Sequence, residues 1–208
     1  MKENNYNLIL TSSGFNDANN YISDEMIDLF SYLSLEKRIM ILANAAPEGS
    51  GNFIAREKVK ENFEKVGASQ VDIIDLNQEN INEIFNYNLI YCLGGDPTYL
   101  INLNKNPLFK KSLIKFLENG IYIGESAGSI ILSNNLKWVY DVKKGTKPKY
   151  NVELDTYRGL GLVEFNIFPH WNNISDNIKN KTFNYEKQHN IKIIKLNDGE
   201  FITVNYKK

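Results

Sequence analysis

The sequence predicts an α/β protein in which helices cover both faces of a mostly parallel sheet. Short apolar runs recur along the first two thirds of the chain, and longer amphipathic segments separate them. Strands that are buried on both faces occur as continuous apolar runs, and helical connections join parallel strands. The length of 208 residues suits one domain better than two, so we expect a single domain over residues 1–208.

Five apolar runs predict the strands of this sheet, and the segments between them predict helices. The expected strands are Asn7–Thr11, Arg38–Ala43, Val71–Leu76, Leu89–Leu93 and Ile121–Gly124. The expected helices lie near Asp24–Leu35 and Ile54–Val66, with a further helical stretch over Thr98–Glu118 that is broken near Pro107.

The final third of the chain has a different pattern. Gly159–Phe168, Ile191–Leu196 and Phe201–Val204 are predicted as strands. The last two flank Asn197, Asp198 and Gly199, and an Asp-Gly pair between apolar runs favours a β-hairpin. We therefore expect an antiparallel hairpin near the C-terminus.

Composition excludes several classes of protein. There are 24 basic and 25 acidic residues, so no basic excess is available to neutralise nucleic-acid phosphates. No apolar run approaches the roughly 20 residues of a membrane-spanning helix, and no signal core follows a basic start. The lone cysteine, Cys92, cannot form an internal disulfide. We expect a soluble, cytoplasmic monomer or homodimer without nucleic-acid or membrane partners.

The strongest chemical signal is Ser126. It lies in residues 124–128, GESAG, between a predicted buried strand and an apolar helix. This Gly-x-Ser-x-Gly pattern is typical of a nucleophile elbow, a sharp turn that lifts the hydroxyl above the sheet edge. The same string also occurs in ordinary turns, but its place between strand and helix favours a nucleophile.

A serine hydroxyl needs a base, and the chain has only two histidines. His170 follows an apolar run and Pro169, so a strand would deliver its imidazole to the edge of the sheet. His189 lies in a polar segment that is typical of a solvated helix end. We therefore predict His170 as the base.

The sequence leaves the acidic partner of His170 open. Asp141 is preferred, because it follows residues 138–140, an apolar stretch that could be a strand end near the elbow. Asp155, Asp176 and Glu125 are rivals, although in such an elbow the side chain of Glu125 would point away from the serine.

An oxyanion hole requires two backbone donors. Ala127 follows the serine and supplies one amide; Gly95, in the turn after the strand Leu89–Leu93, is predicted to supply the other. Neither a metal nor a cofactor is expected, because the two histidines form no cluster with metal-ligand spacing.

Taken together, these residues resemble the aspartyl dipeptidase (peptidase E) and cyanophycinase family of serine peptidases. The resemblance rests on Gly94-Gly95 with Thr98, on the elbow at Ser126, and on Pro169-His170 followed by an aromatic residue. It implies a flavodoxin-like three-layer sandwich related to class I glutamine amidotransferases, peptide hydrolysis through an acyl-enzyme, and short peptide substrates. It also implies that Asp141, fifteen residues after the serine, completes the triad, and that Gly95 and Ala127 form the oxyanion hole.

The sequence departs from the aspartyl dipeptidases at two places. Leu93 stands where they carry a third glycine, and residues 171–188 contain lysines but no arginine to bind a substrate aspartate. Lysine does not replace the planar, bidentate arginine fork. We therefore predict a serine peptidase, possibly a dipeptidase, without strict aspartyl specificity. An esterase or amidase with the same triad, and an inactive ligand-binding homologue, are the alternatives; a cysteine amidotransferase is disfavoured because Cys92 lies within a strand.

Overall fold

The centre of the molecule is a six-stranded sheet with the order β3-β2-β4-β5-β1-β8. The computed structural model describes residues 6–15, 23–47, 53–142, 150 and 157–206. Adjacent strands pair in parallel, except that the last one pairs antiparallel with β1. The strands are β1 (Leu8–Thr11), β2 (Arg38–Leu42), β3 (Gln70–Ile74), β4 (Leu89–Cys92), β5 (Ile121–Glu125) and β8 (Phe201–Val204). The predicted α/β class with a mostly parallel sheet is confirmed.

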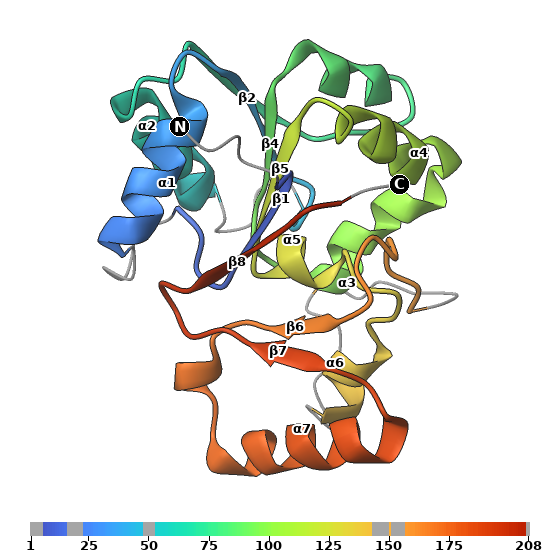
Figure 1. Ribbon diagram of the computed structural model, residues 1–208. Helices are drawn as coiled ribbons and strands as arrows, with labels where there is room; N and C mark the ends of the chain where they lie inside the picture. Colours follow the sequence, from blue (N-terminus) through green and yellow to red (C-terminus); the bar gives the residue numbers. More distant parts are fainter. Residues whose placement is uncertain (1–5, 16–22, 48–52, 143–149, 151–156, 207–208) are drawn as a thin grey trace.

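Helices cover the sheet on both faces, which makes three layers (Figure 1). One face carries α1 (Asp24–Ser34) and α2 (Phe53–Lys65). The other carries α3 (Pro97–Leu100), α4 (Pro107–Phe116), α5 (Ala127–Ile130) and the 3₁₀ helices η1 (Ile81–Asn86) and η2 (Ile101–Lys105). The predicted break in the helical stretch is present, because the side chain of Asn106 caps α4 and Pro107 begins it.

The core is divided by the sheet into two apolar clusters, because successive side chains of a strand point to opposite faces. In β2, Ile39 and Ile41 pack with Met26 and Phe30 of α1. Met40 and Leu42 point to the opposite face and join the cluster of α3, α4 and α5. The apolar runs in the sequence therefore arise from strands that are covered on both sides.

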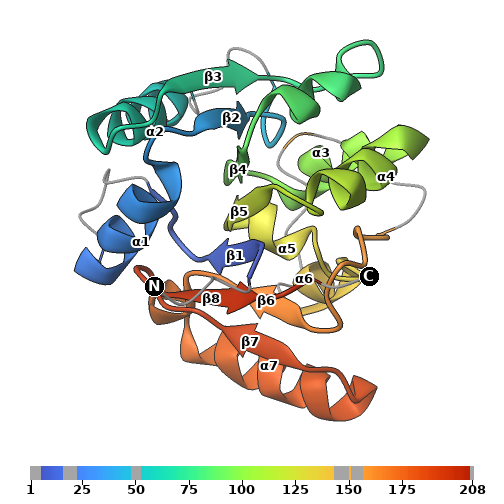
Figure 2. The ribbon, with the colours of Figure 1, turned by 45° about the horizontal axis from the view of Figure 1, so that its top comes forward.

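A second, two-stranded parallel sheet lies beside the C-terminal edge strand (Figure 2). It consists of β6 (Asn166–Phe168) and β7 (Ile193–Lys195), and α6 (Lys137–Val142), η3 (Trp171–Asn173) and α7 (Asp176–His189) belong to the same region. The hairpin prediction is wrong in its pairing: β7 pairs with β6, whereas β8 pairs with β1. The turn at residues 197–199 therefore carries the chain from one sheet to the other.

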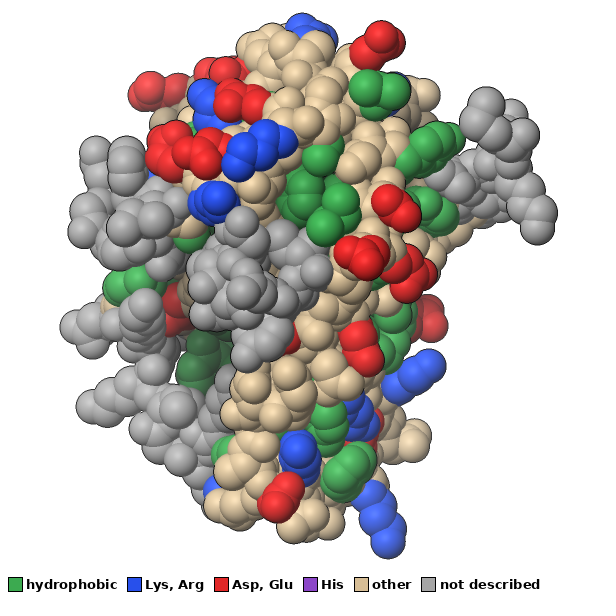
Figure 3. Space-filling model, turned by 90° about the vertical axis from the view of Figure 1, so that its left-hand side faces the viewer, with side chains coloured by type: hydrophobic (Ala, Val, Ile, Leu, Met, Phe, Trp, Pro, Cys, Tyr) green, Lys and Arg blue, Asp and Glu red, His purple; other side chains and the backbone are tan. Residues whose placement is uncertain are grey.

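The outer face of α1 and α2 is a mixed surface of acidic, basic and apolar side chains (Figure 3). In α2 the charges of opposite sign lie one helical turn apart, as in Lys60 with Glu64 and Lys65 with Glu61. Such exposed pairs contribute little to stability but keep the surface polar. None of the helices in the described ranges combines the length and the apolarity that crossing a bilayer requires.

Candidate active site

The site lies where the parallel strands end. The carboxyl ends of β1, β4 and β5 are neighbours in the sheet, so the loops that follow them meet at one edge. In open α/β sheets this edge, at a point where the strand order reverses, is where ligands bind. Here it gathers the loop 12–15 after β1, the turn 93–96 after β4, and Ser126 after β5.

Ser126 has the strained backbone of a nucleophile elbow. Its φ is 46° and its ψ is −102°, an unusual conformation for a residue with a side chain. The turn is tight enough to need both flanking glycines. A Cβ on Gly124 would lie 2.7 Å from the backbone of Gly128, and one on Gly128 would lie 2.4 Å from the carbonyl oxygen of Cys92. Glycine at these positions therefore permits the close approach of strand and helix.

The imidazole of His170 lies next to the Ser126 hydroxyl, with 3.1 Å between Nε2 and Oγ. His170 follows β6 and, like the serine, has a positive φ, at 58°, with His170 in the left-handed helical region. Its amide donates a hydrogen bond to Oγ of Ser12, at 2.7 Å, which attaches His170 to the loop after β1. The side chain is 44% exposed, so the ring faces the open edge of the sheet.

The acidic partner of this histidine is Asp198. Its Oδ1 lies 2.6 Å from Nδ1 of His170 and also accepts a hydrogen bond from Oγ of Ser12, at 2.9 Å. Its Oδ2 accepts from Nδ2 of Asn173, at 2.6 Å. The carboxylate is only 3% exposed, yet donors satisfy both of its oxygens. An Nδ1–H that donates to Asp198 leaves Nε2 free to accept the serine proton.

The prediction that Asp141 orients His170 is corrected by these contacts. Residues 138–140, interpreted as a strand end, belong instead to the helix α6, and Asp141 faces α7. There its Oδ2 accepts a hydrogen bond from the Tyr185 hydroxyl, at 3.1 Å, and the pKa of Tyr185 is raised to about 12, chiefly by burial and also by that carboxylate.

The other rivals do not take this place either. Asp176 lies in the first turn of α7, is 95% exposed, and pairs with Lys179. Asp155 lies outside the described residues. His189 ends α7 and stacks on the ring of Tyr185, with 4.1 Å between centroids.

The two residues predicted to form the oxyanion hole lie in the segments that follow β4 and β5. Gly95 lies in the exposed turn between β4 and α3, and Ala127 is the first residue of α5. Within the described residues neither amide donates a hydrogen bond to the protein, and the first amides of a helix have no acceptor within the helix. Neither amide is thus used within the described part of the fold.

Two further ionisable groups are buried beneath the site. Glu125 precedes the serine, and burial raises its pKa to about 7, although hydrogen bonds from Tyr91 and Gly94 oppose the shift. Cys92 is buried in β4, and burial raises its pKa to about 12. A thiol with so high a pKa stays protonated, so Cys92 is no nucleophile at neutral pH.

All three arginines of the chain lie within the described ranges. Arg56 is buried, and its guanidinium donates to the carbonyl oxygens of Ala43 and Ala46. Arg38 starts β2 at the opposite end of the sheet from Ser126. Arg158 pairs through its backbone with Asn135.

The cations beside the ring of Trp171 are lysines. Nζ of Lys179 and Nζ of Lys195 lie 5.9 Å and 6.0 Å from the ring centre of Trp171, the residue that follows His170. Lys179 also pairs with Asp176, and Lys195 pairs with Glu186. Their charge near the site is thus partly neutralised.

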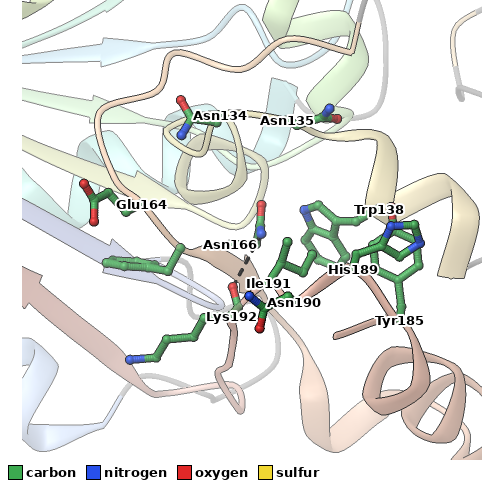
Figure 4. Close-up of a pocket in the computed structure, with 11 residues that line it drawn as sticks. Asn134, Asn135, Trp138, Glu164, Asn166, Tyr185, His189, Asn190, Ile191 and Lys192 are labelled. Carbon is green, nitrogen blue, oxygen red and sulfur yellow. Dashed lines mark hydrogen bonds between the residues drawn. The ribbon is translucent and has the colours of Figure 1, made fainter. Parts of the chain in front are cut away.

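A separate cavity of about 510 Å³ lies at the other end of β6 (Figure 4). Its walls include Asn134, Trp138, Asn166 and His189, but neither Ser126 nor His170. Within the described ranges, no three His, Cys, Asp or Glu side chains converge so that they could hold a metal ion.

Sequence reasoning missed Asp198 and Ser12. The hairpin prediction treats the Asp-Gly pair at residues 198–199 as a turn and gives its carboxylate no role. Ser12 follows a buried strand, and a hydroxyl at the carboxyl end of a parallel strand is a signal that could have found it.

Comparisons with known proteins agree with this geometry. The model of "Peptidase family S51" matches residues 8–208. An uncharacterized peptidase of Listeria innocua is 32% identical to the chain over 57% of the chain's length. One of Listeria monocytogenes is also 32% identical, over 56% of the chain's length. The matched segments span only 57% and 58% of those relatives. The protein named peptidase E of a Nostoc species is 27% identical over 80% of this chain and 66% of its own.

Solved structures show the same fold. The crystal structure of a candidate peptidase E from Listeria monocytogenes EGD-e superposes with a TM-score of 0.75 at 25% identity, over 98% of this chain and 96% of the other. A peptidase from an acI-B1 actinobacterium gives 0.60 at 21% identity, over 84% and 73% of the two chains. The resemblance inferred from the motifs is thereby confirmed.

Proposed function

Because the chain belongs to peptidase family S51, we propose that it is a serine peptidase that cleaves short peptides through an acyl-enzyme at Ser126. One observation carries the proposal. Oγ of Ser126, the imidazole of His170 and the carboxylate of Asp198 form a continuous hydrogen-bonded series, with 3.1 Å and 2.6 Å between the atoms. Nucleophile, base and orienting acid in this order are the arrangement that activates a serine hydroxyl.

The steps follow from the positions of these atoms. Oγ of Ser126 attacks the scissile carbonyl carbon while its proton passes to Nε2 of His170. The carbonyl oxygen becomes an oxyanion that accepts from the amides of Gly95 and Ala127. The intermediate collapses, the C–N bond breaks, and the leaving amine takes the proton from Nε2. Water, deprotonated by the same nitrogen, then hydrolyses the ester.

Asp198 steadies the imidazolium that forms in both halves of the reaction. Its task is to hold the ring and to balance the charge of the imidazolium. Enclosure strengthens this interaction, since a carboxylate that is 3% exposed has few competing water molecules.

Short peptides are the proposed substrate class because relatives of this chain carry the name peptidase E. Strict selection of an N-terminal aspartate is not part of the proposal. A desolvated substrate carboxylate is best bound by a bidentate arginine, and Arg56 is already committed to two backbone carbonyl groups.

The test is hydrolysis of a dipeptide library by the wild type, Ser126→Ala and Ser133→Ala. Ser133 is a matched control, because it is a buried serine whose hydroxyl bonds only to the carbonyl oxygen of Ile130. We expect the wild type and Ser133→Ala to release amino acids, and Ser126→Ala to be slower by about 10³-fold or more. Equal turnover by Ser126→Ala would contradict the proposal. Turnover of esters or other amides but not of dipeptides would favour an esterase or amidase instead.

A further inference from the structure

Glu125 is a buried carboxyl group that the proposed reaction does not use. It is the last residue of β5 and precedes Ser126 directly. Because side chains alternate along a strand, Glu125 points to the same face as Ile123, whose neighbours are the apolar residues of α1 and α2. The carboxyl group therefore lies beneath the elbow, on the face of the sheet opposite α5.

Its two oxygens accept hydrogen bonds from two directions. The Tyr91 hydroxyl donates to Oε2 over 2.7 Å, and that hydroxyl in turn accepts from the amide of Phe15, at 2.6 Å. The backbone of Gly94 also hydrogen-bonds to the carboxyl group. A Cβ placed on Gly94 would lie 2.8 Å from Oε1 and 3.3 Å from Cβ of Ser126, so this turn is packed directly against both residues.

These contacts join three segments that are far apart in the sequence. The loop after β1 is attached through Phe15 and Tyr91, the turn after β4 through Gly94, and the elbow is attached covalently. We propose that Glu125 is a positioning residue that fixes the Gly94–Gly95 turn against the elbow, so that the Gly95 amide faces the oxyanion formed at Ser126. This inference rests on the proposed function.

The surroundings of Glu125 make its carboxylate unfavourable for the stability of the fold. Tyr91 lies within an aromatic cluster with Phe15, Phe30 and Phe63, and none of the described lysines or arginines forms an ion pair with Glu125. Burying a carboxylate without a cation opposes folding, whereas glutamine would fill the same volume uncharged. A costly charge beside a nucleophile indicates a role in function.

If Glu125 has this role, its ionisation should determine how firmly the Gly94–Gly95 turn is held against the elbow. On its own face of the sheet the ionisable neighbour from β4 is Tyr91, whereas Cys92 lies on the opposite face of that strand; burial raises the pKa of both. Glu125, with its pKa raised to about 7, is the first of the three to ionise. As a carboxylate it accepts from Tyr91 and Gly94 together. A proton on one carboxyl oxygen turns that oxygen into a hydrogen-bond donor, so it accepts less well from its neighbour. The NH₂ group of a glutamine side chain has the same effect.

The experiment compares wild type, Glu125→Gln, Tyr91→Phe and Tyr87→Phe on the best dipeptide from the library. Tyr87→Phe is the matched control, because Tyr87 also donates to a carboxylate, Asp72, but precedes β4 at the far end of the sheet. We expect Glu125→Gln to lower kcat about tenfold or more with KM within about twofold, and Tyr91→Phe to lower kcat less. Tyr87→Phe should match the wild type.

The pH profile separates positioning from a purely structural role. The ratio of wild-type kcat to Glu125→Gln kcat should rise between about pH 6 and about pH 8, since the ionisation of groups that both proteins share cancels from the ratio. A flat ratio, or a Glu125→Gln kcat within about twofold of wild type at pH 8, would overturn the inference. So would a loss of kcat that only follows a loss of folded protein, measured by thermal unfolding.

Failure of this inference differs from failure of the proposed function. A fluorophosphonate probe that reacts with serine nucleophiles gives a second readout: its labelling rate should fall in Glu125→Gln and vanish in Ser126→Ala. If Ser126→Ala abolishes labelling and turnover while Glu125→Gln behaves like wild type, the positioning role is wrong and the peptidase stands. If Ser126→Ala has wild-type activity, the proposed function is wrong.

Discussion

In the folded chain Nδ1 of His170 lies 2.6 Å from Oδ1 of Asp198, although 28 residues separate the two in the sequence. The contact joins the end of β6 to the turn that leads from β7 to β8. That turn thus does more than connect strands, because it carries the carboxylate that contacts the imidazole facing Ser126.

The first prediction compares two aspartates. Asp198→Asn should lower kcat by on the order of 10³- to 10⁴-fold, because an amide nitrogen facing Nδ1 favours the wrong tautomer of His170. Asp141→Asn should lower it by less than about twofold, because Asp141 contacts Tyr185 rather than the base. Steady-state kinetics on one dipeptide would check both. A crippled Asp141→Asn beside an unaffected Asp198→Asn would reverse the assignment.

The second prediction concerns Ser12, whose hydroxyl accepts from the His170 amide and donates to Asp198. Ser12→Ala leaves one buried donor and one buried acceptor without this partner, so kcat should fall by about tenfold. Ser31→Ala, which removes an exposed hydroxyl bonded within α1, is the control. A Ser12→Ala enzyme with the kcat of Ser31→Ala would show that Ser12 does not support the catalytic pair.

The third prediction is a pH dependence of stability. Burial raises the folded-state pKa of Glu125 from 4.5 to about 7, so between these values the folded state binds more protons than the unfolded state. The free energy of unfolding contributed by this group therefore falls as pH rises through that window. Glu125→Gln has no carboxyl group at this position and lacks this loss. Between pH 4.5 and pH 8 its free energy of unfolding should therefore rise by up to about 3 kcal/mol relative to that of the wild type.

Urea unfolding of both proteins at several pH values within this range would measure the difference. A stability gap that does not change with pH, or that changes in favour of the wild type, would contradict the raised pKa. Together with the loss of kcat expected for the same variant, a gain in stability would show that Glu125 is kept at the expense of the fold.

The fourth prediction concerns substrate choice. The specificity constant kcat/KM for Asp-Leu should exceed that for Ala-Leu by about tenfold or less, which corresponds to about 1.4 kcal/mol. The reason is that the lysines beside Trp171 are paired with Asp176 and Glu186 and supply only diffuse positive charge. A preference above about 1000-fold, or about 4 kcal/mol, would mean that another group performs the task of the arginine.

The fold was largely predictable from the sequence. Strands covered on both faces leave continuous apolar runs such as residues 39–42 and 89–92, and these need no knowledge of the partner strands. The pairing of β8 was not predictable in this way. A local Asp-Gly turn favours a hairpin, but β1 offered an open edge and the side chain of Asp198 was engaged with His170.

The site was predictable only where its signal is local. Ser126 is marked by glycines within two residues, and His170 by the small number of histidines. The acid has no such mark, because any of several aspartates could reach the ring once the chain is folded. Asp141 was favoured by its distance from the serine in the sequence, yet the helix α6 directs it toward Tyr185.

The most direct test of the central claim is covalent capture of the nucleophile. The protein is treated with a fluorophosphonate, and the modified residue is located by peptide mass spectrometry while dipeptide hydrolysis is followed in parallel. We predict one adduct, on Ser126, whose formation matches the loss of turnover and is strongly slowed in Asp198→Asn. Unmodified Ser126 in a protein that still hydrolyses peptides, or an adduct elsewhere that tracks the loss of turnover, would contradict the account.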